Sequence, residues 1–229
     1  MMKYFYSLSV SWDKKPNIQT KSERIISKEI LCNAFIKTDA GTIGLNGDRI
    51  AEKVFPLLKG HKIFISHSHR DEALAIEVAK IIKKTYGVDS FIDSQLWGNV
   101  YDLAHEIIIM HHEKESSIYQ YNICESVFAH IFNMLNIALS EAMLQADVFV
   151  FLNTPTSTER IDDELWVASP WLYHELSFTS ILASCQNSFV KSAKQELLLE
   201  NFSIFRKMPK YHLTKISWEK FKNVLEQIL

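Results

Sequence analysis

The segment Asp147–Leu152 (DVFVFL) is apolar almost throughout and shows no alternation with polar residues. A strand with one face in water alternates apolar and polar side chains, whereas a strand covered by helices on both faces is continuously apolar. The segment therefore predicts a buried strand of a parallel sheet. Because parallel neighbours are joined by crossover connections, usually helices, the rest of the domain should alternate between strands and helices.

That alternation is visible from residue 61 onward. Strands are predicted at 62–65, 88–92, 147–152 and within 211–214, and helices at about 68–87, 103–111, 123–145, 170–184 and from residue 217 onward. An order of this kind predicts a doubly wound α/β domain, in which functional loops lie at the carboxyl ends of the strands.

Capping signals mark several helix ends. Ser68-His-Arg-Asp71 has the spacing of a capping box at a helix start, and Gly87 is a stop signal at the end of the same helix. Ser169 followed by Pro170 places a cap and a first-turn proline at the start of a later helix. Ser217 is the predicted cap of the final helix.

The first 60 residues carry weaker patterns. Residues 22–37 are weakly helical, residues 39–47 are rich in turn formers, and residues 49–59 favour a helix. We therefore expect residues 1–60 to form an N-terminal extension packed on a main domain at 61–229. Two long polar stretches, 94–121 and 154–168, are predicted to be loops, apart from the helix near 103–111.

Composition removes several classes of partner. The net charge of −2 on 229 residues gives no overall electrostatic case for nucleic acid or an anionic membrane. The sequence contains no run of about 18 apolar residues, so no transmembrane helix is expected. The N-terminus lacks the apolar core of a signal peptide, so a cytoplasmic location is expected. The three cysteines are far apart, which predicts reduced thiols.

Common cofactor fingerprints are missing. Gly41-Thr-Ile-Gly44-Leu-Asn-Gly47 is not the GxGxxG of dinucleotide-binding folds, and no P-loop sequence occurs. His67-Ser-His69-Arg-Asp71 is an HxHxD sequence, similar to part of the zinc motif of metallo-β-lactamases, but Glu72 stands where that motif has a further His. A polar loop after a strand is the favoured interpretation, so no metal and no resident cofactor are expected, with a zinc hydrolase as a distant third hypothesis.

Four short motifs, taken together, resemble the Toll/interleukin-1 receptor (TIR) domain family, above all its prokaryotic branch. They are the segments 62–71 (KIFISHSHRD), 91–97 (FIDSQLW), 151–154 (FLNT) and 169–175 (SPWLYHE). They follow one another in the family's order and at its expected places in a βα array. The resemblance covers residues 61–229 and implies a flavodoxin-like fold with a five-stranded parallel sheet.

The resemblance also implies an activity. Many bacterial and plant members of the family, and one animal axonal member, cleave NAD⁺ at the nicotinamide–ribose bond. Their catalytic Glu stands four residues after a Trp, which corresponds to Trp171 and Glu175 in this chain. Positions i and i+4 share one face of a helix, and Glu175 would lie little more than one turn inside the helix that Ser169 caps.

Six further residues are candidates for substrate binding: Phe64, Ser66, Asp93, Trp97, Asn153 and Trp171. Glu175 could hold the ribose hydroxyls and stabilise the positive charge that develops on the sugar. Trp97 or Phe64 could stack on the cationic nicotinamide ring. The alternatives are that Phe64 is a core residue, that Asp93 caps a loop, and that Glu175 is a solvated helix residue.

The expected products depend on the acceptor. Water gives ADP-ribose, an internal adenine nitrogen or ribose hydroxyl gives a cyclic ADP-ribose isomer, and another nucleophile gives a conjugate. The resemblance implies a role in bacterial antiphage defence, assembly through TIR–TIR contacts, and a separate sensor or effector protein. The main alternative is a non-catalytic assembly module, in which residues 94–121 form an interface.

Overall fold

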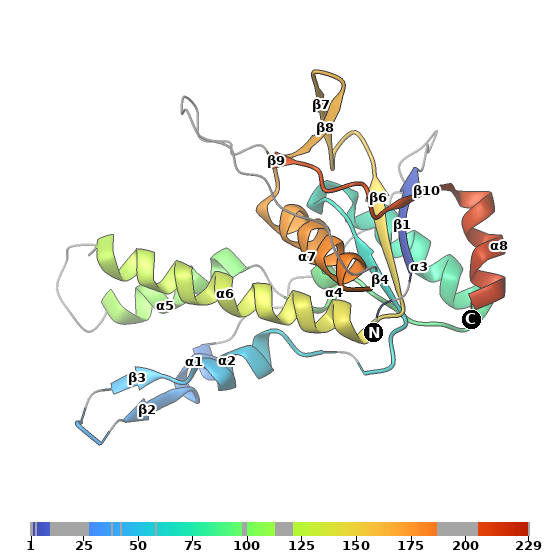
Figure 1. The fold of residues 1–229 in the computed structure, drawn as a ribbon. Coiled ribbons are helices and arrows are strands. Elements are labelled where there is room, and N and C mark those ends of the chain that lie inside the picture. Colours follow the sequence, from blue (N-terminus) through green and yellow to red (C-terminus); the bar gives the residue numbers. More distant parts are fainter. Residues whose placement is uncertain are drawn as a thin grey trace. The chain divides into compact units, whose positions relative to one another are not determined.

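The computed structural model describes residues 2, 4–9, 28–37, 39–41, 43–57, 59–97, 100–112, 121–186 and 206–228 (Figure 1). They belong to two compact units. The first unit comprises Met1–Thr20, Lys59–Ile92 and Ala142–Leu229, and the second comprises Lys21–Leu58 and Asp93–Glu141.

The first unit is built on a five-stranded parallel sheet. Its strands lie in the order β10 (Thr214–Ser217), β1 (Tyr4–Ser9), β6 (Val148–Asn153), β4 (Ile63–Ser66) and β5 (Ser90–Phe91). The helices of this unit are α3 (Glu72–Tyr86), preceded by the 3₁₀ turn η1 (His69–Asp71), α7 (Pro170–Gln186) and α8 (Trp218–Ile228). A mixed α/β fold with a parallel sheet flanked by helices is thus confirmed.

Both faces of the sheet are covered, as the apolar run of β6 requires. Val148 and Val150 join the core that α3 and α8 form on one face. Phe149 points to the opposite face, because side chains alternate along a strand, and its ring stacks on Phe64 with centroids 5.8 Å apart. Phe64 stacks in turn on Phe91 at 5.3 Å. The buried-strand prediction for β6 is confirmed on both faces.

The N-terminal residues depart from the predicted organisation. Residues 4–9 do not belong to a separate extension: β1 pairs with β6 on one side and with β10 on the other. Leu8 is fully buried within the core of the α3–α8 face. Residues 21–58 fall in the second unit, so the structure divides the chain at other places than residue 60.

Helix ends in the first unit follow their capping signals in most cases. Ser169 Oγ accepts a hydrogen bond from the backbone N–H of Leu172 at 3.3 Å, as an N-cap does. Gly87 ends α3 in the left-handed region, with φ of 72°. The prediction of a capping box at Ser68 is wrong, because the Ser68 hydroxyl donates to the Asp71 carboxylate and makes no cap hydrogen bond.

The stretch 154–168 is not a plain loop. It contains an antiparallel hairpin of β7 (Glu159–Ile161) and β8 (Glu164–Val167), and β8 also pairs with β9 (Arg206–Lys207). Asp162 and Asp163 both have positive φ, 47° and 61°. Two such residues form the tight primed turn that suits a hairpin, and Asp tolerates this conformation better than most residues. The acidic residues thus have a conformational role in the turn.

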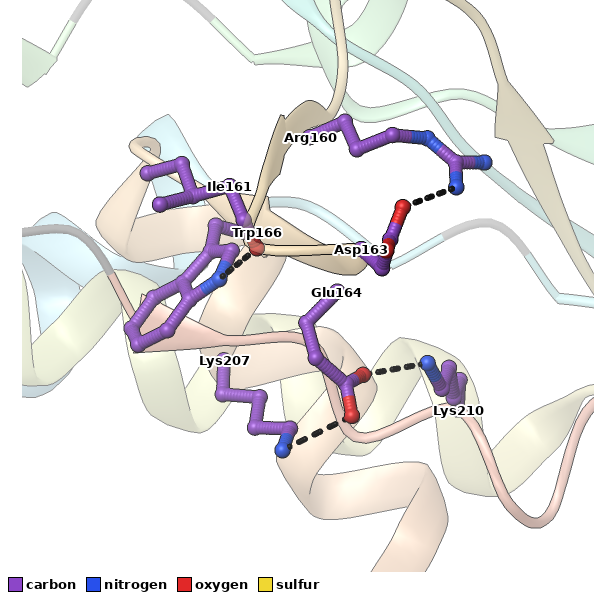
Figure 2. A network of polar contacts seen from close by, with 7 residues as sticks. All are labelled: Arg160, Ile161, Asp163, Glu164, Trp166, Lys207 and Lys210. Carbon is purple, nitrogen blue, oxygen red and sulfur yellow. Dashed lines mark hydrogen bonds and ion pairs between the residues drawn. The ribbon is translucent and has the colours of Figure 1, made fainter.

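One acidic residue of this hairpin is held by two cations (Figure 2). Glu164 accepts from Lys210 at 2.6 Å and pairs with Lys207 at 3.0 Å. These hydrogen bonds, Lys210 first, lower the pKa of Glu164 below its ordinary value. On the same hairpin, Trp166 Nε1 donates to the carbonyl of Ile161 at 3.3 Å.

We expect Lys210→Gln to raise the pKa of Glu164 toward its ordinary value, because the stronger of the two cationic donors is removed. A carbon-detected NMR titration of the Glu164 carboxyl measures this pKa. Arg160→Gln is the matched control, since Arg160 pairs with Asp163, 3.8 Å away, and makes no such contact with Glu164. An unchanged Glu164 titration in Lys210→Gln would contradict the assignment.

The second unit is mainly helical. Its elements are α1 (Lys28–Cys32), β2 (Phe35–Lys37), β3 (Ile43–Leu45), α2 (Gly47–Val54), α4 (Asp93–Leu96), α5 (Val100–His112) and most of α6 (Tyr121–Gln145). Within the described part of the predicted helix at 22–37, α1 is helical, but β2 is a strand that begins a hairpin turning at Gly41, so the prediction is wrong there. Residues 22–27 lie outside the described residues. The long helix predicted at 123–145 is confirmed as α6.

Within the stretch 94–121, the predicted helix near 103–111 is confirmed as α5, whereas α4 was not predicted; residues 98–99 and 113–120 lie outside the described residues. Among the described helices, Asn122–Gln145 of α6 is long and apolar enough to cross a membrane by length and composition. A core helix of a soluble protein meets the same two criteria. The three cysteines, Cys32, Cys124 and Cys185, are free thiols.

Candidate functional site

The strand order places a switch point between β4 and β6. The chain passes from β4 to β5 on one side and then to β6 on the other side of β4. In open α/β sheets, connections that diverge in this way leave a crevice at the carboxyl ends of the two strands, where ligands bind. Ser66 is the last residue of β4 and Asn153 the last residue of β6. The candidate site is therefore built at these two strand ends.

Glu175 and Ser66 meet at this edge of the sheet. Glu175 lies on α7, shortly after the Ser169 cap, and only 3% of the residue is exposed. Ser66 Oγ donates a hydrogen bond of 2.5 Å to Glu175 Oε2. Both side chains are buried, so each satisfies a polar group of the other away from water. The structure thus brings together two of the predicted site residues that are 109 positions apart in sequence.

Asn153 and Trp171 lie in the same unit. Asn153 Oδ1 accepts from Thr158 Oγ1 at 3.1 Å, which fixes the start of the loop after β6. Trp171 is half-buried in the first turn of α7, four residues before Glu175. Its place on the Glu175 side of the helix follows from the i, i+4 spacing.

The two aromatic residues expected to stack on nicotinamide are buried in cores. Phe64 is 1% exposed and lies between Phe91 and Phe149, so its ring faces are already covered. Trp97 is 4% exposed, packs edge-on against Phe55 at 5.4 Å and donates from Nε1 to the carbonyl of Pro56 at 3.1 Å. Both residues stabilise the units to which they belong.

Asp93 and Trp97 belong to the second unit, whereas Ser66 and Glu175 belong to the first. Asp93 begins the short helix α4, and its carbonyl accepts from the Trp97 N–H at 2.9 Å.

A hydroxyl cluster next to Ser66 was not predicted. Asp71 Oδ2 accepts from Ser68 Oγ at 2.6 Å, from Thr154 Oγ1 at 2.5 Å and from Thr156 Oγ1. Asp71 itself is buried. The cluster joins the loop after β4 to the loop after β6. Its sequence signal is the hydroxyl-rich run 154–158 (TPTST) directly after a buried strand, within the stretch predicted to be a polar loop.

A shallow depression of about 260 Å³ opens beside this cluster. Residues from three segments line it: the loop after β4, the loop after β6, and the start of α7. Those with polar side chains include Ser68, His69, Arg70, Thr156, Thr158 and Ser169. Glu175 is buried and does not line the depression.

The HxHxD sequence does not gather metal ligands. His67 is buried and its Nδ1 lies 3.4 Å from the carbonyl of Ile65, while His69 is exposed. Within the described ranges, no group of three His, Cys, Asp or Glu residues is placed to hold a metal ion.

His212 connects α7 to the loop before β10. Thr179 Oγ1 donates to the carbonyl of Glu175 at 2.8 Å and lies 2.9 Å from His212 Nε2. Since the Thr179 proton is used in the helix, His212 Nε2 is the donor and Nδ1 carries the lone pair. Nδ1 is buried with no partner among the described residues. Burial lowers the pKa of His212 to about 4, so the ring is neutral at pH 7.

This burial predicts a pH-dependent stability. The His212 pKa is near 6.5 in the unfolded chain and about 4 in the folded chain, so between these values the unfolded state binds more protons. The stabilisation is full above about pH 6.5 and is lost as the pH falls toward 4, by up to roughly 3 kcal/mol. Urea unfolding between pH 7 and pH 4.5 measures it.

His212→Gln is the matched variant, because the Gln amide can donate to Thr179 without titrating. The difference in free energy of unfolding between wild type and variant isolates His212 from the other titrating groups. We expect the wild type to lose more stability than the variant as the pH falls. Parallel pH profiles would contradict the proposed burial of a neutral ring.

Comparison of the chain with protein-family models, with curated proteins and with solved structures gave no match.

Proposed function

We propose that the chain is a TIR-like enzyme that cleaves the nicotinamide–ribose bond of NAD⁺, with Glu175 as the catalytic carboxylate. The observation that carries this proposal is the Ser66–Glu175 pair. It consists of a buried carboxylate at the carboxyl ends of the two central strands, in the helix that the family's Trp-x-x-x-Glu motif implies. Carboxylates at such a crevice are suited to stabilise a developing positive charge.

We also propose that the sheet is a variant of the flavodoxin-like arrangement. That arrangement has the spatial order 2-1-3-4-5. Here β5, β4 and β6 occupy the first three places in that order, and β10 occupies the last. The N-terminal strand β1 takes the fourth place, which a strand between β6 and β10 would otherwise fill. This reading keeps the TIR-like order of the motifs and supports the proposed function.

The chemistry needs few groups. The bond from C1′ of the ribose to the pyridinium nitrogen breaks, and its electron pair neutralises the nicotinamide ring, so no strong acid is required. The sugar becomes oxocarbenium-like, and the Glu175 carboxylate stabilises that charge and holds a ribose hydroxyl. Water then adds its oxygen to C1′ and releases a proton, which gives ADP-ribose. An adenine nitrogen or a ribose hydroxyl in place of water gives a cyclic isomer.

Substrate must displace the Ser66 hydrogen bond or share the carboxylate with it. Oε2 of Glu175 already accepts from Ser66, and Glu175 is 3% exposed. We propose that substrate binding moves the start of α7 or the loop after β6, so that a ribose hydroxyl reaches the other oxygen. Assembly through TIR–TIR contacts, with a separate sensor or effector protein in antiphage defence in the cytoplasm, belongs to the same proposal.

The burial of Glu175 also favours the alternative function. In a non-catalytic assembly module, the Ser66–Glu175 hydrogen bond would only fix α7 to the sheet. Incubation of concentrated purified protein with NAD⁺ in ¹⁸O-labelled water, followed by mass spectrometry, separates the two. Hydrolysis gives nicotinamide and ¹⁸O-labelled ADP-ribose, and cyclisation gives nicotinamide and an unlabelled isomer. No nicotinamide, even with a crowding agent and infected-cell lysate, would favour the assembly module.

A further inference from the structure

The depression beside Asp71 has a defined hydrogen-bonding character, because its hydroxyl protons are already used. Ser68 and Thr156 both donate to Asp71, and Thr158 donates to Asn153. A hydroxyl has one proton and two lone pairs. The oxygens of these three residues can therefore only accept hydrogen bonds from a molecule in the depression.

The charged residues around the depression add two further preferences. Glu159, which also lines it, is another acceptor, whereas Arg70 offers a permanent positive charge and several N–H donors. A ligand that fits both sides presents hydroxyl groups to the wall of oxygens and an anionic group to Arg70. The volume of about 260 Å³ lies below the roughly 300–1,000 Å³ of pockets for drug-sized ligands, so it suits a fragment and not a whole dinucleotide.

We propose that this depression is a subsite for the ribosyl phosphate group of a nucleotide, and that Asp71 sets its preference for hydroxyl donors by holding Ser68 and Thr156 as acceptors. Asp71 touches no ligand in this account and is a positioning residue. The proposal rests on the proposed function in that NAD⁺ supplies such a group, and it places part of the substrate beside the start of α7, the helix that carries Glu175.

The test uses ribose 5-phosphate and its 2-deoxy and 3-deoxy analogues as probes with the full chain, since none of them carries the nicotinamide–ribose bond that the proposed enzyme cleaves. Binding is followed by NMR titration of backbone amides in residues 68–70. Thr156→Val, which replaces the hydroxyl by a methyl group, should weaken ribose 5-phosphate binding by about two- to tenfold. Thr156→Ser restores the hydroxyl and should restore the affinity. Thermal unfolding checks that each variant is folded.

The analogues make the comparison specific. One of the two deoxy sugars should bind two- to tenfold more weakly than ribose 5-phosphate to the protein that retains Thr156. The affinity for that deoxy sugar should not fall further in Thr156→Val. Asp71→Asn, whose amide can donate, should weaken the preference for ribose over the deoxy sugar without abolishing phosphate binding. A variant that is unfolded is replaced by Ser68→Ala, which removes one acceptor of the same wall.

Three results would overturn the proposal. The first is that removing the sugar hydroxyl and replacing Thr156 by Val each weaken binding by amounts that add. The second is equal affinity for inorganic phosphate and ribose 5-phosphate. The third is that ribose 5-phosphate does not bind at tens of millimolar. These outcomes are separate from failure of the proposed function. If the effects of the sugar hydroxyl and Thr156 on affinity depend on each other but no nicotinamide is released, the chain is a nucleotide-binding module. If nicotinamide release depends on Glu175 but the two effects are independent, the enzyme stands and this subsite is wrong.

Discussion

Glu175→Gln is expected to lower the rate of nicotinamide release from NAD⁺ by at least about 100-fold, which is the scale for removal of one charged catalytic group. Gln is nearly isosteric and can still accept from Ser66 through its carbonyl oxygen, so the variant keeps the contact between α7 and β4. It lacks the negative charge that stabilises the oxocarbenium-like sugar. The loss should therefore appear in kcat, with little change in the thermal unfolding temperature.

Glu164→Gln is the matched control, because it makes the same substitution in the first unit and Glu164 lies on the β7–β8 hairpin. That variant should keep the wild-type rate. Ser66→Ala should have an intermediate effect, since the carboxylate stays and only its orienting donor is lost. If Glu175→Gln turns NAD⁺ over at the wild-type rate, Glu175 is a structural residue and the assembly module becomes the better account.

Leu8→Ala is expected to destabilise the first unit by about 2–5 kcal/mol, the usual range for truncation of a fully buried leucine. Leu8 lies on β1, between β6 and β10, and contributes to the core under α3 and α8. If residues 4–9 were an extension packed on a complete domain, the substitution would not lower the free energy of unfolding by this amount in every spectroscopic signal from the domain. Urea unfolding, followed by fluorescence and circular dichroism, measures it.

The neighbouring residue provides the control. Ser9 is exposed at the end of the same strand, and Ser9→Ala should change the free energy of unfolding by no more than about 0.5 kcal/mol. Equal and small effects of both variants would show that β1 does not belong to the cooperative core, and the strand order given above would then be wrong.

Elements with strong local signals could be predicted from the sequence. The apolar run of β6 required cover on both faces, and its valines and phenylalanines do meet different layers. Ser169 and Pro170 mark the start of α7 by local chemistry. Ser169 is the N-cap, and Pro170 lacks an N–H at a position where the helix does not need one. Gly87 ends α3 because glycine adopts the left-handed conformation without a steric penalty.

Elements whose partners lie far away in sequence could not be predicted. The place of β1 in the sheet is set by pairing with β6, whose register joins Ser9 to Asn153. No local pattern in residues 4–9 encodes that distance. The turn at Asp162 and Asp163 falls in a polar stretch predicted to be a loop, because Asp also favours loops and the hairpin depends on pairing.

The candidate site divides in the same way. The family resemblance of the segment 169–175 predicted Glu175 as a site residue, and the end of an apolar run predicted Ser66 at a strand end; these two side chains do meet through a hydrogen bond. The burial of Phe64 and Trp97 depends on aromatic neighbours from other segments, so an aromatic residue in a motif could not be distinguished from a core residue. The Asp71 cluster depends on two loops that meet only in the fold.

The most direct measurement of the central claim is the position of NAD⁺ in a crystal structure of the Glu175→Gln protein soaked with NAD⁺. Our account predicts the nicotinamide-bearing ribose within hydrogen-bond distance of residue 175, at the carboxyl ends of β4 and β6. NAD⁺ bound with that ribose at any other place in the chain would contradict the account, and so would its absence from these strand ends at saturating concentration.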